Sequence, residues 1–100
     1  MPYADPLGDR ELDAALAGLP EWTRDGECIR RTTTAHDFRE AVELVVSVAE
    51  AAEAAGHHPD IHLTGYRRLT FELSTHAVKA ITRRDIELAT QIDRLILGDR

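Results

Sequence analysis

One short segment restricts the folds open to this chain. Residues 68–73 read RLTFEL, so the apolar side chains Leu69, Phe71 and Leu73 alternate with polar ones. In a strand, alternate side chains point to opposite faces, which gives one apolar and one polar face. Such strands are typical of antiparallel sheets covered on one side, whereas strands of buried parallel sheets are apolar throughout. The segment therefore predicts an antiparallel sheet with one buried face, and the helices predicted around it make this a two-layer α+β fold.

The rest of the chain supplies elements for that fold. We predict a short helix over 9–18 with Asp9 as its cap, strands over 22–24 and 28–34 around an Asp25-Gly26 turn, and a long helix over 34–56. A third strand around 61–63 turns at 64–65 into strand 68–73, and a last helix follows Thr82 and ends at Gly98. The predicted order is α-ββ-α-ββ-α, a four-stranded antiparallel sheet with helices packed on one face. Residues 1–8 are expected to be a flexible lead, and residues 9–100 a single domain.

The long helix has an apolar stripe at helical spacing, which predicts its buried face. Gly56 is expected to end this helix in the left-handed conformation that glycine adopts without strain. The residues of the expected stripe are Phe38, Ala41, Val42, Val45, Val48, Ala49 and Ala52.

Composition excludes several classes of protein. Apolar residues make up 43% and charged residues 30% of the 100 residues, which is typical of a globular chain. The formal charge of −6 argues against direct nucleic-acid binding, which depends on a basic face. No apolar run is long enough for a membrane span, and no signal peptide is visible. A single cysteine, Cys28, allows no internal disulfide, so we expect a cytoplasmic protein.

Four of the five histidines lie in the stretch 53–85. His57 and His58 follow the predicted end of the long helix, where the partial negative charge of the helix favours a protonated imidazole. His76 follows strand 68–73, and the hairpin predicted under the helix would bring it close to the pair. Glu53 occupies the last helical turn, an unfavourable place for a carboxylate, which suggests that it bonds a histidine or a ligand; a solvated glutamate is the alternative. These histidines are candidates for general acid–base catalysis.

Other residues of the stretch have simpler explanations. Asp85 lies three residues after Thr82 and is explained by helix capping. Arg84 lies at the same helix start, where it is either solvated or binds an anion or substrate. Two histidines and a carboxylate could also hold zinc or iron, although adjacent histidines rarely point to one ion. His36 and His62 are interpreted as surface residues.

The pattern Glu53-x-x-x-His57-His58-Pro59, followed by Tyr66, His76 and Asp85, resembles the signature of the pterin-4a-carbinolamine dehydratases. The resemblance covers roughly residues 12–96. It implies a two-layer α+β fold and a hydro-lyase that dehydrates 4a-hydroxytetrahydropterin to quinonoid dihydropterin, with no metal or other cofactor. This reaction recycles the pterin cofactor of aromatic amino-acid hydroxylases.

The resemblance also implies roles for individual residues. The catalytic acid–base set of the family corresponds to His57, His58 and His76. The resemblance does not assign which of them is the acid and which is the base. Glu53, Ser74, Thr75, Arg84 and Asp85 correspond to the substrate-binding residues. The chain departs from the pattern at Gly56, where some members have aspartate or asparagine, and at Ile61, where some have tryptophan.

Members of this family form homodimers or homotetramers, and some act as dimerisation cofactors of a transcription factor. A protein-interaction module with weak catalysis is therefore the second hypothesis, and a histidine–metal enzyme the third. Alternating Arg68, Thr70 and Glu72 leave a polar sheet face, so a polar contact between sheets is one expected route to an oligomer.

Overall fold

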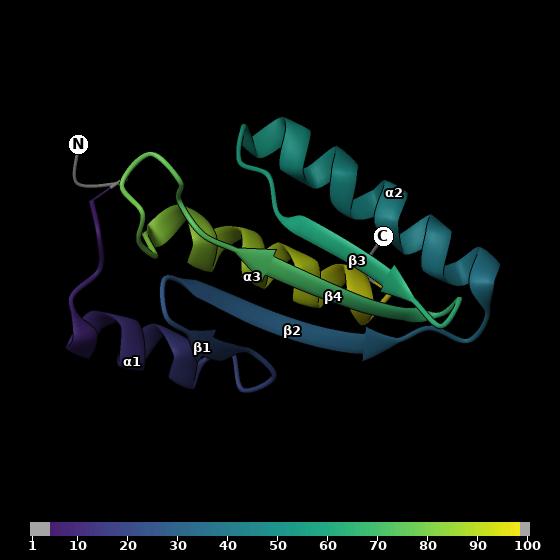
Figure 1. Ribbon diagram of the computed structural model, residues 1–100, viewed down its shortest axis with the longest axis horizontal. Coiled ribbons are helices and arrows are strands. Elements are labelled where there is room, and N and C mark those ends of the chain that lie inside the picture. Colours follow the sequence, from purple (N-terminus) through teal and green to yellow (C-terminus); the bar gives the residue numbers. More distant parts are fainter. Residues whose placement is uncertain (1–4, 99–100) are drawn as a thin grey trace.

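The computed structural model describes residues 5–98, and within them the elements follow the predicted order. These are α1 (Asp9–Ala17), β1 (Thr23–Asp25), β2 (Cys28–Thr34), α2 (Phe38–Ala55), β3 (Asp60–Thr64), β4 (Arg68–Leu73) and α3 (Arg83–Ile96). The strands form one antiparallel sheet in the order β1-β2-β4-β3, and the helices lie on one of its faces (Figure 1). The predicted two-layer α+β fold is confirmed.

The core lies between the apolar sheet face and the helices. Leu69, Phe71 and Leu73 of β4 are completely buried, as their alternation predicts. Central position explains this: β4 pairs with β2 on one side and with β3 on the other. Trp22, which precedes β1, is also buried and belongs to the same core.

The long helix starts later than predicted. α2 begins at Phe38, because β2 continues through Thr34 in register with Arg68 and because the Asp37 carboxylate accepts a hydrogen bond of 2.8 Å from the Glu40 amide. An aspartate in extended backbone that bonds the third helical amide is a strong helix start. The β-branched residues before it therefore extend the strand rather than the helix.

The predicted buried stripe of α2 is wrong in part. Ala41, Val48 and Ala52 are buried, but Leu44, absent from the predicted stripe, is buried as well. Phe38 and Val42 are exposed, at 55% and 39% of their surface. The helix is thus rotated so that one apolar edge remains outside the core.

The start of the chain also differs from expectation. Residues 1–4 of the predicted lead lie outside the described range. Farther along the lead, Pro6 bridges to Thr82, and the Leu7 amide donates to the Ile81 carbonyl at 2.9 Å. Asp9 does not cap α1. Gly8 holds that position, and its amide donates to the Glu11 carboxylate at 3.1 Å.

A polar contact fastens the first hairpin to the last helix. One carboxylate oxygen of Asp93 in α3 accepts a hydrogen bond from Trp22 Nε1 at 2.7 Å and one from Arg31 at 2.6 Å. The Arg31 side chain is only 13% exposed, so the Asp93 carboxylate is needed to balance its buried positive charge.

We expect Asp93→Ala to lower the free energy of unfolding by about 1–3 kcal/mol, because a buried indole N–H and guanidinium lose their acceptor. Urea unfolding followed by tryptophan fluorescence measures this change. Gln91→Ala is the control, since Gln91 is an exposed residue of the same helix. Equal stability of the two variants would contradict the importance of this contact.

Candidate active site

The three predicted catalytic histidines surround one pocket. His57 and His58 follow the end of α2, and His76 follows β4; together with Ser74 they line a hollow of about 220 Å³. The remaining lining residues are Gly56, Thr75, Ala77 and Arg84. We call this hollow the histidine pocket. The hairpin β3–β4 brings the two ends together because its strands run antiparallel beneath α2.

His57 is the buried member of the set. It is 8% exposed, and its Nε2 lies 2.5 Å from Oδ1 of Asp85, which is completely buried. The other oxygen, Oδ2, accepts hydrogen bonds of 2.9 Å from the Thr75 hydroxyl and from the Thr82 amide. Asp85 therefore caps α3, as predicted, and also fixes the imidazole, which capping alone did not predict.

His58 is a mostly exposed member of the set and is paired with Glu53. The Nε2 atom of His58 hydrogen-bonds the Glu53 carboxylate, and both side chains are mostly exposed. The hypothesis that Glu53 bonds a histidine is thus supported by a direct contact. A carboxylate in the last turn of α2 is unfavourable for the helix, and the histidine offsets that cost.

Gly56 has φ of +62°, as predicted for a residue that ends a helix. This conformation turns the chain so that His57 and His58 leave the helix toward the pocket. Arg84 donates from its guanidinium to the Gly56 carbonyl at 2.7 Å. The cation thereby meets the negative end of α2, which explains its place at the start of α3, where a positive charge is otherwise disfavoured.

Ser74 and Thr75 form the floor between the histidines. The Thr75 side chain is buried and also bonds the Thr82 hydroxyl at 2.8 Å. The Thr75 amide donates to the Ala80 carbonyl at 2.9 Å. Thr75 is therefore a structural part of the floor, and Ser74 is the half-exposed residue that faces the pocket.

Six of the eight predicted site residues line this pocket, and the other two, Glu53 and Asp85, contact its histidines. Within residues 5–98, no group of three or more His, Cys, Asp or Glu side chains is arranged to hold a metal ion. Three imidazoles around one hollow, two of them bonded to carboxylates, form an arrangement suited to proton transfer.

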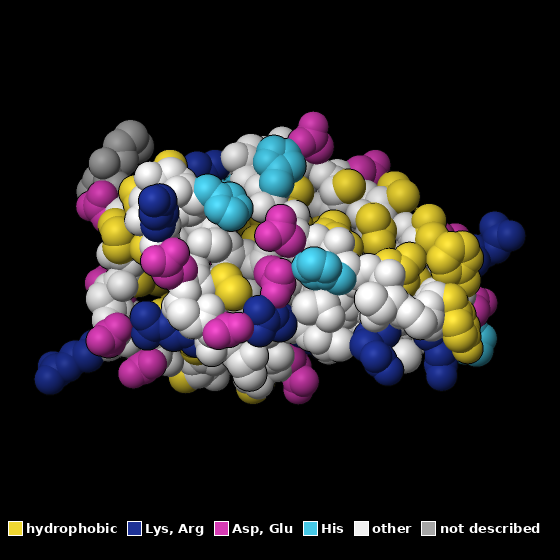
Figure 2. Space-filling view, in the orientation of Figure 1, with side chains coloured by type: hydrophobic (Ala, Val, Ile, Leu, Met, Phe, Trp, Pro, Cys, Tyr) yellow, Lys and Arg dark blue, Asp and Glu magenta, His cyan; other side chains and the backbone are white. Residues whose placement is uncertain are grey.

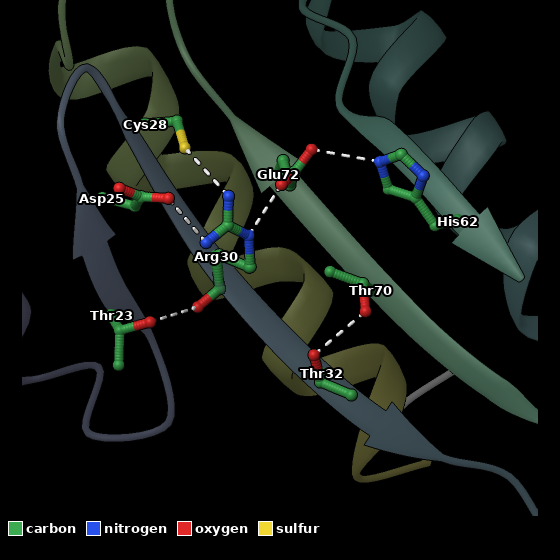
Figure 3. Close-up of polar contacts among 8 residues, drawn as sticks. All are labelled: Thr23, Asp25, Cys28, Arg30, Thr32, His62, Thr70 and Glu72. Atoms are coloured by element: carbon green, nitrogen blue, oxygen red, sulfur yellow. Dashed lines mark hydrogen bonds and ion pairs between the residues drawn. The ribbon is translucent and has the colours of Figure 1, made fainter. Parts of the chain in front are cut away.

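Sequence reasoning missed a second polar cluster, on the open face of the sheet (Figure 3). Glu72 accepts a hydrogen bond of 2.6 Å from Nε of Arg30 and lies 3.0 Å from Nε2 of His62. Arg30 also donates to Asp25 at 2.9 Å. The hydrogen bond from Arg30, with that from His62, holds the pKa of Glu72 below its ordinary value. His62 is exposed, as predicted, but it has a partner that only strand register could reveal.

Residues 5–95 match the family model described as "Pterin 4 alpha carbinolamine dehydratase". Among similar proteins, one of Nocardia farcinica, named "Putative pterin-4-alpha-carbinolamine dehydratase", is 54% identical and covers 89% of this chain and 93% of its own length. A protein of Mycobacteroides abscessus with the same name is 47% identical over 90% of this chain and 95% of its own length. Within the described residues, no helix is long and apolar enough to cross a membrane.

Solved structures share the fold. A protein from Brucella melitensis, titled a transcriptional coactivator/pterin dehydratase, superposes with a TM-score of 0.86 at 29% identity, covering 91% of this chain and 98% of that one. A pterin dehydratase-like protein identified as a RuBisCO assembly factor in the alpha-carboxysome has a TM-score of 0.60 at 15% identity, covering 74% of this chain and 84% of its own. The second likeness concerns the fold alone. The match over 5–95, with relatives of this identity and coverage, shows that the chain belongs to the pterin-4-alpha-carbinolamine dehydratase family.

Proposed function

We propose that this protein dehydrates 4a-hydroxytetrahydropterin to quinonoid dihydropterin and so recycles a pterin cofactor. The observation that supports this proposal is the histidine pocket, in which His57, His58 and His76 face one hollow. The dehydration breaks the C4a–O bond and removes the proton from N5, so it needs one acid and one base on neighbouring atoms. Three imidazoles around one pocket can supply both.

His57 is the proposed base. If its Nε2–H is donated to the buried Asp85 carboxylate, Nδ1 carries the lone pair that can accept the N5 proton. The carboxylate then stabilises the imidazolium that forms. One of the two exposed histidines, His58 or His76, donates the proton with which the hydroxyl leaves as water. The C4a=N5 double bond forms as the C–O bond breaks, and no electrons are exchanged with a cofactor.

The other site residues are proposed to hold this arrangement. Asp85 and Glu53 position His57 and His58 through their hydrogen bonds. Arg84 and the chain around Ser74 and Thr75 are the proposed contacts for the pterin ring, since they line the pocket. In this proposal the residues of the pocket wall bind the substrate, and the carboxylates of Asp85 and Glu53 orient the histidines.

Purified protein tests the proposal directly. We expect it to accelerate the disappearance of 4a-hydroxytetrahydropterin, generated in the assay by an aromatic amino-acid hydroxylase, above the uncatalysed rate. An ultraviolet stopped-flow trace with and without the protein measures the difference. A rate equal to the uncatalysed one, at protein concentrations in excess of substrate, would reject the dehydratase assignment.

A self-association role is supported by a separate observation on α2. Phe38, Val42 and Val46 follow each other at intervals of four residues and are all exposed, at 55%, 39% and 54%. Figure 2 shows hydrophobic side chains gathered along this helix. Arg39 and Glu43 line the same hollow of about 320 Å³ as Phe38 and Val42.

We propose that this stripe is covered by a second copy of the chain. A two-fold, antiparallel contact centred on Val42 would set Phe38 of one copy against Val46 of the other. It would also bring Arg39 of one copy near Glu43 of the other, so the polar rim is self-complementary. This contact uses a helix face, in addition to the polar sheet contact expected from the sequence.

Val46→Asp is expected to reduce the oligomer, because it would bury an unpaired carboxylate in the proposed contact. Size-exclusion chromatography with light scattering over micromolar concentrations measures the mass. Gln91→Ala is the control, since Gln91 is exposed on α3 and lies outside the stripe. A wild type that is already monomeric, or a Val46→Asp variant of unchanged mass, would rule out this contact.

A further inference from the structure

A second pocket adjoins the histidine pocket on the open face of the sheet. Its volume is about 290 Å³, and it shares Ser74 and His76 with the histidine pocket. We call it the sheet pocket. Its other lining residues are Glu27, Cys28, Arg30, Asp60, Glu72 and Leu73. Figure 2 shows histidine, acidic and basic side chains side by side on this face of the molecule.

Strand register places the charged groups of the sheet pocket in one row. Asp60 pairs with Glu72, and Glu72 pairs with Arg30, so all three side chains project from the polar face at the same level. Ser74, two residues after Glu72, lies just beyond this row at the end of β4. Regular strands therefore carry the charged row of the sheet pocket, and they fix its shape better than loops would.

The guanidinium of Arg30 is held by two carboxylates in this pocket (Figure 3). Glu72 and Asp25 bind its Nε and one terminal nitrogen, while the other terminal nitrogen lies 4.0 Å from the Cys28 sulfur. Burial raises the pKa of the Cys28 thiol, so it remains neutral beside the cation. The nitrogen next to Cys28 can still donate to a ligand, and the exposed carboxylate of Asp60 can accept.

Substrate chemistry connects the two pockets. In a tetrahydropterin, C6 is bonded to N5, the atom that loses its proton in the proposed reaction. A substituent at C6 therefore lies next to the reacting atoms, and the two pockets meet at Ser74 and His76. Each pocket alone is below the range of about 300–1,000 Å³ found for ligand sites, whereas the two together fall within it.

We propose that the sheet pocket is the subsite for a neutral, hydroxylated C6 substituent of the pterin, with Arg30 and Asp60 as specificity-determining residues. This inference rests on the proposed function. A donor and an acceptor in one row suit a vicinal diol, whose hydroxyls both donate and accept. Glu27, Asp60 and Glu72 outnumber Arg30, so a substituent that ends in carboxylates is disfavoured by charge.

Binding of unreactive dihydropterins tests this subsite without turnover. We expect 7,8-dihydrobiopterin, with a dihydroxypropyl group at C6, to bind about tenfold more tightly than 6-methyl-7,8-dihydropterin, as two added hydrogen bonds would give. Isothermal titration calorimetry measures both affinities. In Arg30→Met and in Asp60→Ala, the preference is expected to fall to about threefold or less, while the affinity for the methyl compound stays unchanged.

Controls separate the subsite from the proposed function. Thr32→Ala alters the same sheet face away from the pocket, where Thr32 bonds only Thr70 in Figure 3, and should keep the tenfold preference. Equal binding of both pterins by wild type, or an unchanged preference in both pocket variants, overturns the subsite alone. If neither pterin binds, both the subsite and the proposed function are rejected. Tighter binding of 7,8-dihydrofolate than of dihydrobiopterin would overturn the choice of a neutral substituent.

Discussion

Replacing His57 with alanine should lower kcat for pterin dehydration by about 10²–10⁴-fold, the range that a positioned acid or base contributes. His57 lines the histidine pocket and is bonded to Asp85, so the variant removes both the proposed proton acceptor and its link to a carboxylate. We expect His76→Ala to lose activity to a comparable extent, since His76 lines the same pocket. Stopped-flow measurement over a range of substrate concentrations gives kcat and KM separately.

His36→Ala is the matched control for these variants. His36 is an exposed residue before α2 and does not line the histidine pocket. It should retain wild-type kcat. Because His57 is buried, circular dichroism and urea unfolding of each variant must accompany the kinetics. A folded His57→Ala or His76→Ala protein with wild-type kcat would remove that histidine from the proposed catalytic set.

Asp85→Ala should cause the largest loss of stability of any single site substitution, about 3–5 kcal/mol. The completely buried carboxylate accepts hydrogen bonds from the Thr75 hydroxyl and the Thr82 amide and contacts His57. Its removal leaves those buried donors without this acceptor and breaks the capping box that Asp85 forms with Thr82 at the start of α3. Urea unfolding measures the loss.

Asp85→Asn separates the capping role from the histidine role. The amide oxygen can still accept from Thr82, so part of the stability should return relative to Asp85→Ala. The charge that stabilises a protonated His57 is absent, so kcat should remain low. Glu53→Gln changes the carboxylate that bonds the other histidine of the pair, His58. Because Glu53 is exposed, its effect on the free energy of unfolding should be within about 0.5 kcal/mol. Wild-type kcat in Asp85→Asn would show that the carboxylate does not support the base.

Much of the site could be predicted because it depends on local signals. A glycine directly after an apolar helical stripe is a local signal for a helix end, so the two histidines that follow Gly56 are expected to emerge there. The alternation of apolar and polar residues identified β4 and its buried face, and it therefore placed His76 just after the end of that strand. The start of α2 could not be placed as well, since the competition between strand pairing of Thr34 and capping by Asp37 is decided by the neighbouring strand.

By itself, the sequence determined the two-layer fold, the order of its elements and the histidines at a helix end and a strand end. Periodicity, turn residues and caps act over a few residues, so they can be read without coordinates. The tertiary structure decided which distant groups meet: Asp85 with His57, Glu72 with Arg30 and His62, and the two pockets that share Ser74 and His76. Such contacts depend on strand register and on the rotation of each helix about its axis, and these are set by how the whole core packs.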